Sequence, residues 1–125
     1  MKKIWILVFA LALIIFAVFS TKISFHDTSE YITVAKYLAG INNVNLFIGH
    51  SIVYPFIISF FLRLWPSLTT IALLNSLWIF LIGLTIFFLD DKKAFIIFTF
   101  SSLTWFISIQ TTPILPASFF FLLAF

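Results

Sequence analysis

The chain has 125 residues, of which 63% are hydrophobic and only 9% carry a charged side chain. An average globular protein is about 45–50% apolar and about 25% charged, and a small soluble domain cannot bury so large an apolar fraction. The composition therefore excludes an ordinary soluble domain and predicts an integral membrane protein. The net charge of +3 is spread along the chain without a basic face, which argues against nucleic-acid binding. The absence of Cys excludes disulfides and thiolate metal sites.

The charged residues divide the chain into long uncharged stretches, and a spanning helix needs about 20 mostly apolar residues. We therefore expect one all-α region of polytopic transmembrane helices, with spans at about 4–20, 67–89 and 94–111 and an incomplete one at 114–125. The last stretch has twelve residues, which at about 1.5 Å per residue are too few to cross a bilayer. We expect from this that the sequence is a fragment of a longer protein.

Met1-Lys2-Lys3 followed by an apolar run is also how a secretory signal peptide begins. Val18-Phe19-Ser20 is a poor cleavage site, because cleavage requires small residues. The flanking residues favour a retained transmembrane anchor over a cleaved signal.

The run 51–65 permits two interpretations, a short span or a helix lying at the membrane interface. The positive-inside rule separates them, because cytoplasmic loops carry an excess of Lys and Arg. If the run lies at the interface, four basic residues are cytoplasmic and three are outside; if it spans, the excess is reversed. The count favours the interfacial helix, with the N-terminus and Asp90–Lys93 in the cytoplasm of a cell-membrane protein.

Residues 21–66 then form one extracytoplasmic segment, which begins with a second interfacial helix at 27–39. Asp27 is a good N-cap and Glu30 follows at the capping-box spacing. An apolar stripe recurs at helical spacing, and Gly40 is placed to end the helix in a left-handed conformation. This part of the fold is therefore expected to be a juxtamembrane amphipathic helix in the first outer loop.

Each polar residue here also has a purely structural interpretation. Asp27 and Glu30 can simply cap their helix, and His26 and His50 lack the spacing of a zinc site. Asn75 inside a span more often joins helices than binds a substrate. Phosphate-binding loops, serine hydrolase elbows and zincin motifs are absent from the sequence.

The order of the features points to one family. A basic start and one span are followed by Asp27-x-x-x-Tyr31-x-x-x-Ala35, then Gly49-His50-Ser51-Ile52-Val53-Tyr54-Pro55, an apolar helix, Arg63-x-Trp65 and further spans. This pattern resembles the N-terminal part of the membrane glycosyltransferases with the GT-C fold, which use lipid-linked sugar donors. The likeness is to the branch of the aminoarabinose lipid A transferase and the protein O-mannosyltransferases.

The resemblance implies transfer of a sugar from a polyprenyl-phosphate donor to an acceptor hydroxyl on the extracytoplasmic side. It implies that Asp27 is the catalytic carboxylate, with the substrate-binding candidates Glu30, Tyr31, His50, Lys36 and Arg63. Family members commonly carry a second acidic residue in the next outer loop, which here reads Gln110-Thr111-Thr112-Pro113-Ile114-Leu115-Pro116 without a carboxylate. We therefore expect no metal site or other cofactor, although a divalent metal would be possible if that second acid lay elsewhere.

The expected partners are the lipid bilayer, the lipid-linked sugar and the remaining spans of a full-length protein. The 125-residue chain alone is expected to be inactive as a transferase. The alternative is a small non-enzymatic membrane protein, either an accessory subunit or a channel-like protein.

Overall fold

A computed structural model describes residues 2–19, 26–41, 52–89, 92–101, 104–105 and 114–124. This part of the chain is helical and contains no strand, which confirms the predicted all-α class. The helices are α1 (Lys2–Phe19), α2 (His26–Leu38), α3 (Val53–Leu64), α4 (Leu68–Phe88), α5 (Lys92–Phe100) and α7 (Ile114–Leu123).

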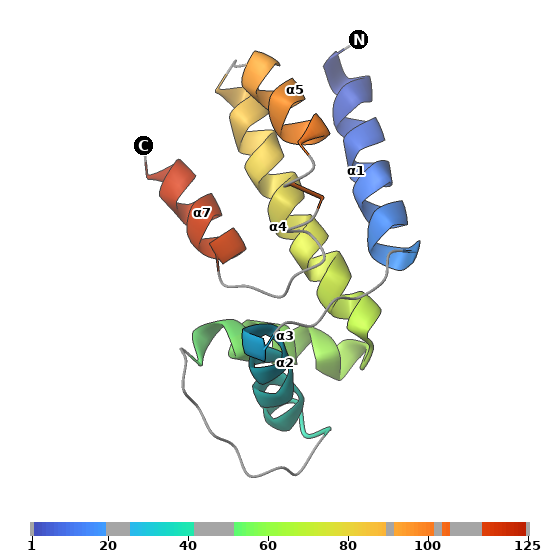
Figure 1. Ribbon diagram of the computed structural model, residues 1–125, viewed down its shortest axis with the longest axis vertical. Coiled ribbons are helices and arrows are strands. Elements are labelled where there is room, and N and C mark those ends of the chain that lie inside the picture. Colours follow the sequence, from blue (N-terminus) through green and yellow to red (C-terminus); the bar gives the residue numbers. More distant parts are fainter. Residues whose placement is uncertain are drawn as a thin grey trace.

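Helix α4 is the axis of the molecule. Helices α1, α5 and α7 each pack against it, and α2 and α3 pack against each other at the end where α4 begins (Figure 1). In Figure 1, α1 and α4 run along the long axis in opposite directions, and α3 runs across their lower ends. The structure therefore has an apolar bundle and an outer pair, which we define as α2 and α3.

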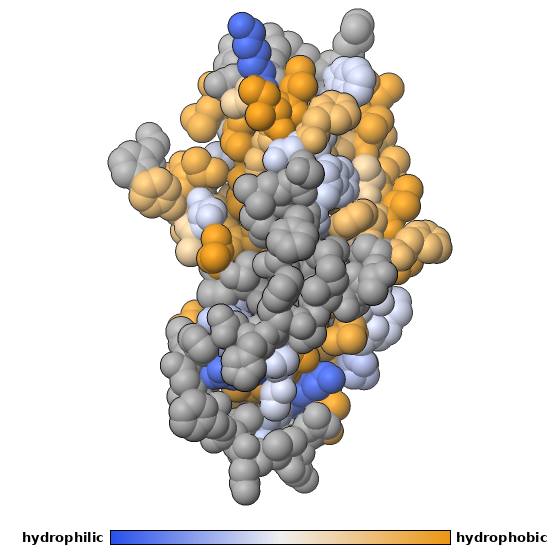
Figure 2. Space-filling view, in the orientation of Figure 1, coloured by the Kyte–Doolittle hydropathy of each residue, from blue (hydrophilic) through white to orange (hydrophobic). Residues whose placement is uncertain are grey.

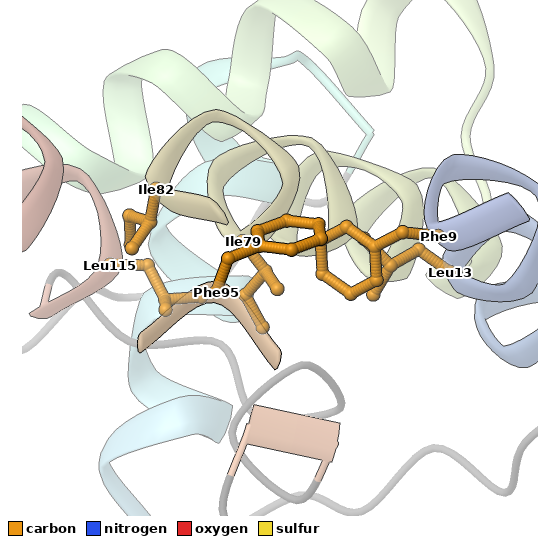
Figure 3. Close-up of a cluster of buried hydrophobic side chains, with 6 residues drawn as sticks. All are labelled: Phe9, Leu13, Ile79, Ile82, Phe95 and Leu115. Atoms are coloured by element: carbon orange, nitrogen blue, oxygen red, sulfur yellow. The ribbon is translucent and has the colours of Figure 1, made fainter. Parts of the chain in front are cut away.

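The core of the bundle is a row of apolar side chains that crosses from α1 to α7. Figure 3 shows this row, which consists of Phe9, Leu13, Ile79, Ile82, Phe95 and Leu115. Phe9 makes edge-on ring contacts with Phe95 of α5 and with Trp105, at centroid distances of 5.7 and 6.3 Å. Aromatic pairs in this geometry stabilise a core beyond the area they bury. α1 therefore contributes Phe9 and Leu13 to the core that it shares with α4, α5 and α7.

Gly83 of α4 permits the close approach of α1. A Cβ atom at this position would lie 2.8 Å from Cε1 of Phe9 and 3.2 Å from Cε1 of Phe98. The rings of two neighbouring helices thus occupy the space that any other residue would need. The chain has only three glycines, and at Gly83 one of them permits close packing of two helices.

Helix α5 ends earlier than the predicted segment 94–111. It stops at Phe100, Ser101 is not helical, and Thr104 and Trp105 are helical again. The hydroxyl of Thr104 donates to the carbonyl oxygen of Phe98 at 2.6 Å, and Nε1 of Trp105 donates to that of Thr99 at 2.9 Å. The last carbonyls of a helix have no partner within it, so these two side chains satisfy the groups that the early end leaves open.

Much of the apolar surface of the bundle faces outward. On α1 only a stripe including Phe9, Leu13 and Ala17 is buried, while Ile4, Trp5 and most other large side chains are exposed. Figure 2 shows hydrophobic atoms over much of the visible bundle and strongly hydrophilic atoms near the two ends of the molecule. Soluble monomers rarely expose large continuous apolar patches, so this surface suits an apolar environment.

One described helix, α4, is long and apolar enough to cross a membrane. It has 21 residues, close to the 20 that a spanning helix needs. Shorter apolar helices lie at Ile4–Phe19, Val53–Leu64 and Ile114–Leu123. By length and composition, the structure therefore supports association with a membrane through α4.

The Gly83 contact yields a stability prediction. Gly83→Ala is expected to destabilise the fold by about 1–3 kcal/mol, because the added methyl group forces the buried Phe9 ring off its position. The measurement is thermal unfolding of the protein in detergent. In a double-mutant cycle, Phe9→Leu should cost less in the Gly83→Ala background than in the wild type, because the shortened side chain removes the clash. Additive effects of the two changes would show that the close approach is not a constraint.

Candidate functional site

Asp27 lies in the first turn of α2. The helix begins at His26, so Asp27 is its second residue rather than the N-cap that the capping-box pattern predicted. The side chains of His26 and Asp27 lie outside the described residues. A carboxylate in the first turn is still favourable, because the positive end of the helix dipole lies there.

Tyr31 anchors this end of α2 on α3. It lies four residues after Asp27, one helical turn further on, and its ring meets Tyr54 edge-on at a centroid distance of 6.1 Å. Tyr31 is buried, and Glu30 beside it is partly buried. The turn of α2 that follows Asp27 is therefore fixed against α3 by an aromatic pair.

Tyr54 connects this pair to the bundle. Its hydroxyl donates to Oδ1 of Asn75 on α4 at 2.8 Å, and both side chains are at most 2% exposed. Burial raises the pKa of the Tyr54 phenol, so the hydroxyl stays protonated and remains a donor. The structure confirms the interpretation of Asn75 as a residue that joins helices, and it identifies Tyr54 as the partner.

The far end of α2 is closed by a Schellman motif. The amide of Ile41 donates to the carbonyl of Lys36, and the amide of Gly40 donates to that of Tyr37, both at 2.9 Å. Gly40 has φ of +77°, which confirms the predicted left-handed helix end. Arg63 of α3 is exposed, and its Nη2 donates to the carbonyl oxygen of Leu38 at 2.7 Å. A cation at this position also complements the negative end of the helix dipole.

The structure therefore separates the predicted site residues into two groups. Asp27, Glu30 and Tyr31 lie at the start of α2, whereas Lys36 and Arg63 lie at its end. Nine residues separate Asp27 from Lys36, which is about 13 Å along a helix axis. His50 lies outside the described residues. A small substrate group beside Asp27 therefore cannot contact both ends of α2. The role of Arg63 that the structure shows is to cap the far end of α2, through the carbonyl of Leu38.

Two residues of this region were not among the predicted site residues. Tyr54 and Asn75 form the buried link between the outer pair and α4, and Tyr54 entered the sequence analysis only as part of the segment 49–55. The sequence contains one indication of this link, the polar Asn75 within an apolar helix. A polar residue at such a position needs a hydrogen-bond partner, but the sequence does not identify which residue it is.

The described residues contain no group of three or more His, Asp or Glu side chains able to hold a metal ion. No protein-family model, curated protein or solved structure matches the chain.

The Tyr54–Asn75 hydrogen bond between the outer pair and the bundle gives the second prediction. Tyr54→Phe is expected to lower the free energy of unfolding by about 1–3 kcal/mol, because it removes a buried hydrogen bond and exposes no new surface. Tyr37→Phe is the matched control, because Tyr37 is exposed on the same outer pair and its loss should change stability by less than about 0.5 kcal/mol. Thermal unfolding in detergent measures both, and equal effects would contradict the role of the buried hydroxyl.

Proposed function

We propose that the chain is the N-terminal part of a membrane glycosyltransferase that transfers a sugar from a polyprenyl-phosphate donor to an acceptor hydroxyl outside the cytoplasm. The observation that carries this proposal is the position of α2. Its first turn holds Asp27, and the Tyr31–Tyr54–Asn75 contacts attach it to the end of an apolar bundle.

The proposal treats the bundle as a polytopic membrane region. α4 has the length of a span, and α1, α5 and α7 surround it with exposed apolar side chains. α3 has twelve residues, about 18 Å of helix, and runs across the bundle axis in Figure 1. Both features favour an interfacial helix over a span for α3. The outer pair then lies at the extracytoplasmic surface, with Lys2, Lys3 and the α4–α5 turn at the cytoplasmic one.

The proposed chemistry follows from the position of the outer pair, and with it Asp27, at the extracytoplasmic membrane surface. A polyprenyl phosphate holds its sugar at the membrane surface, with the phosphate as leaving group. Asp27 accepts the proton of the acceptor hydroxyl as the oxygen bonds to the anomeric carbon and the bond from that carbon to the phosphate oxygen breaks. Glu30 and Tyr31 are the adjacent candidates for substrate contacts, and His50 is the candidate for holding the phosphate. Lys36 and Arg63 are candidates for contacts with parts of the substrate that lie about 13 Å from Asp27, along the axis of α2.

Membrane orientation gives the third prediction. Single Cys substitutions at Lys36 and Lys92 can be probed with an impermeant thiol reagent, because the native chain has no Cys. We expect labelling from outside intact cells at position 36 and not at position 92. Labelling at both positions would mean that α3 spans the membrane and that the outer pair is not a single extracytoplasmic layer.

The role of Asp27 gives the fourth prediction. Asp27→Asn is expected to slow sugar transfer on the order of 10²–10⁴-fold, because it removes a general base. The change loses only a dipole contribution of about 0.3–1 kcal/mol, so the helix should remain in place. Turnover of a polyprenyl-phosphate sugar is measured with the full-length protein in membranes, at matched protein amounts.

Glu30→Gln is the control, because it removes a neighbouring charge of the same helix and should cost much less activity. If the Asp27→Asn protein transfers sugar at a near wild-type rate, Asp27 has a structural role and is not the general base. It would favour the alternative of a non-enzymatic accessory or channel-like membrane protein.

A further inference from the structure

The position of α2 relative to the bundle depends on α3. Among the described helices, α2 packs extensively on α3 alone, and α3 packs in turn on α4. The outer pair shares an apolar core that extends to Ile71 and Leu74 of α4. Because apolar contact is non-directional, it fixes the angle between α3 and α4 less sharply than a hydrogen bond does. The angle of α3 is therefore sensitive to a directional contact between these two helices.

α3 is joined to α4 at one end and hydrogen-bonded to it near the other. A short corner leads from α3 into α4 (Figure 1), where the carbonyl oxygen of Trp65 accepts from the Ser67 amide at 2.8 Å and from the Thr70 hydroxyl at 2.7 Å. Tyr54 lies eleven residues before Trp65, about 16 Å along the helix. Its hydroxyl donates to Oδ1 of Asn75 at 2.8 Å, so this hydrogen bond holds the end of α3 that is away from the corner.

Tyr54 also supports the start of α2. The ring of Tyr31 meets it edge-on at a centroid distance of 6.1 Å, and Asp27 lies one helical turn before Tyr31. The far end of α2 has a different contact, in which the carbonyl of Leu38 accepts from Arg63 in the last turn of α3, next to the corner. A rotation of α3 about the corner would therefore move the start of α2 more than its far end.

We propose that Tyr54 and Asn75 are positioning residues: their hydrogen bond holds the end of α3 on α4 and thereby sets the position of the α2 turn that carries Asp27. Both side chains are at most 2% exposed, so they act through the helices and not by touching the substrate. This positioning stands on the contacts alone, whereas its effect on sugar transfer rests on the proposed function.

Distances between spin labels measure the positioning directly in the protein in detergent, because the chain has no Cys of its own. Ser29→Cys and Tyr37→Cys label the start and the far end of α2, and each is paired with Leu77→Cys on α4. All three positions are exposed. Double electron–electron resonance should show that Tyr54→Phe broadens the distance distribution of the Ser29 pair and leaves that of the Tyr37 pair unchanged.

Ile58→Val is the matched control for the spin-label distances. Ile58 is fully buried in the same core, and the change lowers stability without removing a hydrogen bond. It should leave both distance distributions unchanged. An unchanged Ser29 distribution in the Tyr54→Phe protein, or equal broadening of the Ser29 and Tyr37 pairs, would overturn the positioning role.

Turnover of a polyprenyl-phosphate sugar by the full-length protein tests the effect on transfer. Tyr54→Phe should lower kcat roughly tenfold and change KM for the donor less than about twofold, because a misplaced base weakens the transition state more than donor binding. In the Asp27→Asn background, Tyr54→Phe should have almost no further effect, because no base remains to be misplaced. The same loss in both backgrounds would show that Tyr54 does not act through Asp27, and would overturn its kinetic role.

The two measurements distinguish failure of the positioning role from failure of the proposed transferase. Near wild-type transfer by the Asp27→Asn protein would overturn the transferase, whereas a Ser29 distribution that still broadens would support the positioning. Slow transfer by the Asp27→Asn protein together with wild-type transfer by the Tyr54→Phe protein would support the transferase and overturn the kinetic role of Tyr54.

Discussion

The Phe9 ring of α1 lies against Gly83 of α4, and the arrangement of the bundle depends on this contact. Because α4 has no side chain at that position, the two helices approach closely enough for Phe9 to reach Phe95 of α5 and Trp105 beyond it. Leu115 of α7 completes the same core. In the described residues, these helices are held together by the shape of their apolar side chains and by ring contacts.

The outer pair is attached to this bundle differently. α2 and α3 share a core of their own that contains Ala35, Tyr54, Ile58 and Leu62, and it extends to Ile71 and Leu74 of α4. Within that apolar contact, the Tyr54–Asn75 hydrogen bond is directional and buried, so it fixes where α3 meets α4. Tyr31 then fixes α2 on α3, and Asp27 lies one turn before Tyr31. In the proposed transferase, the height of the carboxylate above the membrane is therefore set by residues that need not touch the substrate.

Local patterns in the sequence predicted much of this arrangement. Apolar stretches between charges located α1, α3, α4 and α7 to within a few residues, and helical spacing together with Gly40 located α2 and its end. The predicted helix 27–39 starts one residue late, and Asp27 lies in the first turn of α2 rather than at the N-cap, because capping patterns specify a helix start only approximately.

Features that depend on three-dimensional contact were not predictable in this way. No local pattern pairs Tyr54 with Asn75, 21 residues apart, or places the Phe9 ring over Gly83. The end of α5 at Phe100 also escaped prediction, because the hydrophobic pattern continues past it. The side chains of Thr104 and Trp105 donate hydrogen bonds to the last carbonyls of α5. The nine-residue spacing alone separates Lys36 from Asp27 on one helix, whereas the position of Arg63 at the far end of α2 follows only from its contact with Leu38.

We propose that α3 lies in the plane of the membrane surface, across the end of the bundle from which α4 crosses the membrane. Solid-state NMR in oriented bilayers tests it directly, because a backbone ¹⁵N shift reports the tilt of a helix against the bilayer normal. Arg63 is the one arginine of the chain and lies in α3, so an arginine label reports this helix alone. The chain has three glycines, so the signal of Gly83 in α4 is assigned by its loss from the glycine-labelled Gly83→Ala protein. The account predicts a shift near the in-plane limit for Arg63 and near the transmembrane limit for Gly83. Transmembrane shifts for both residues would contradict it.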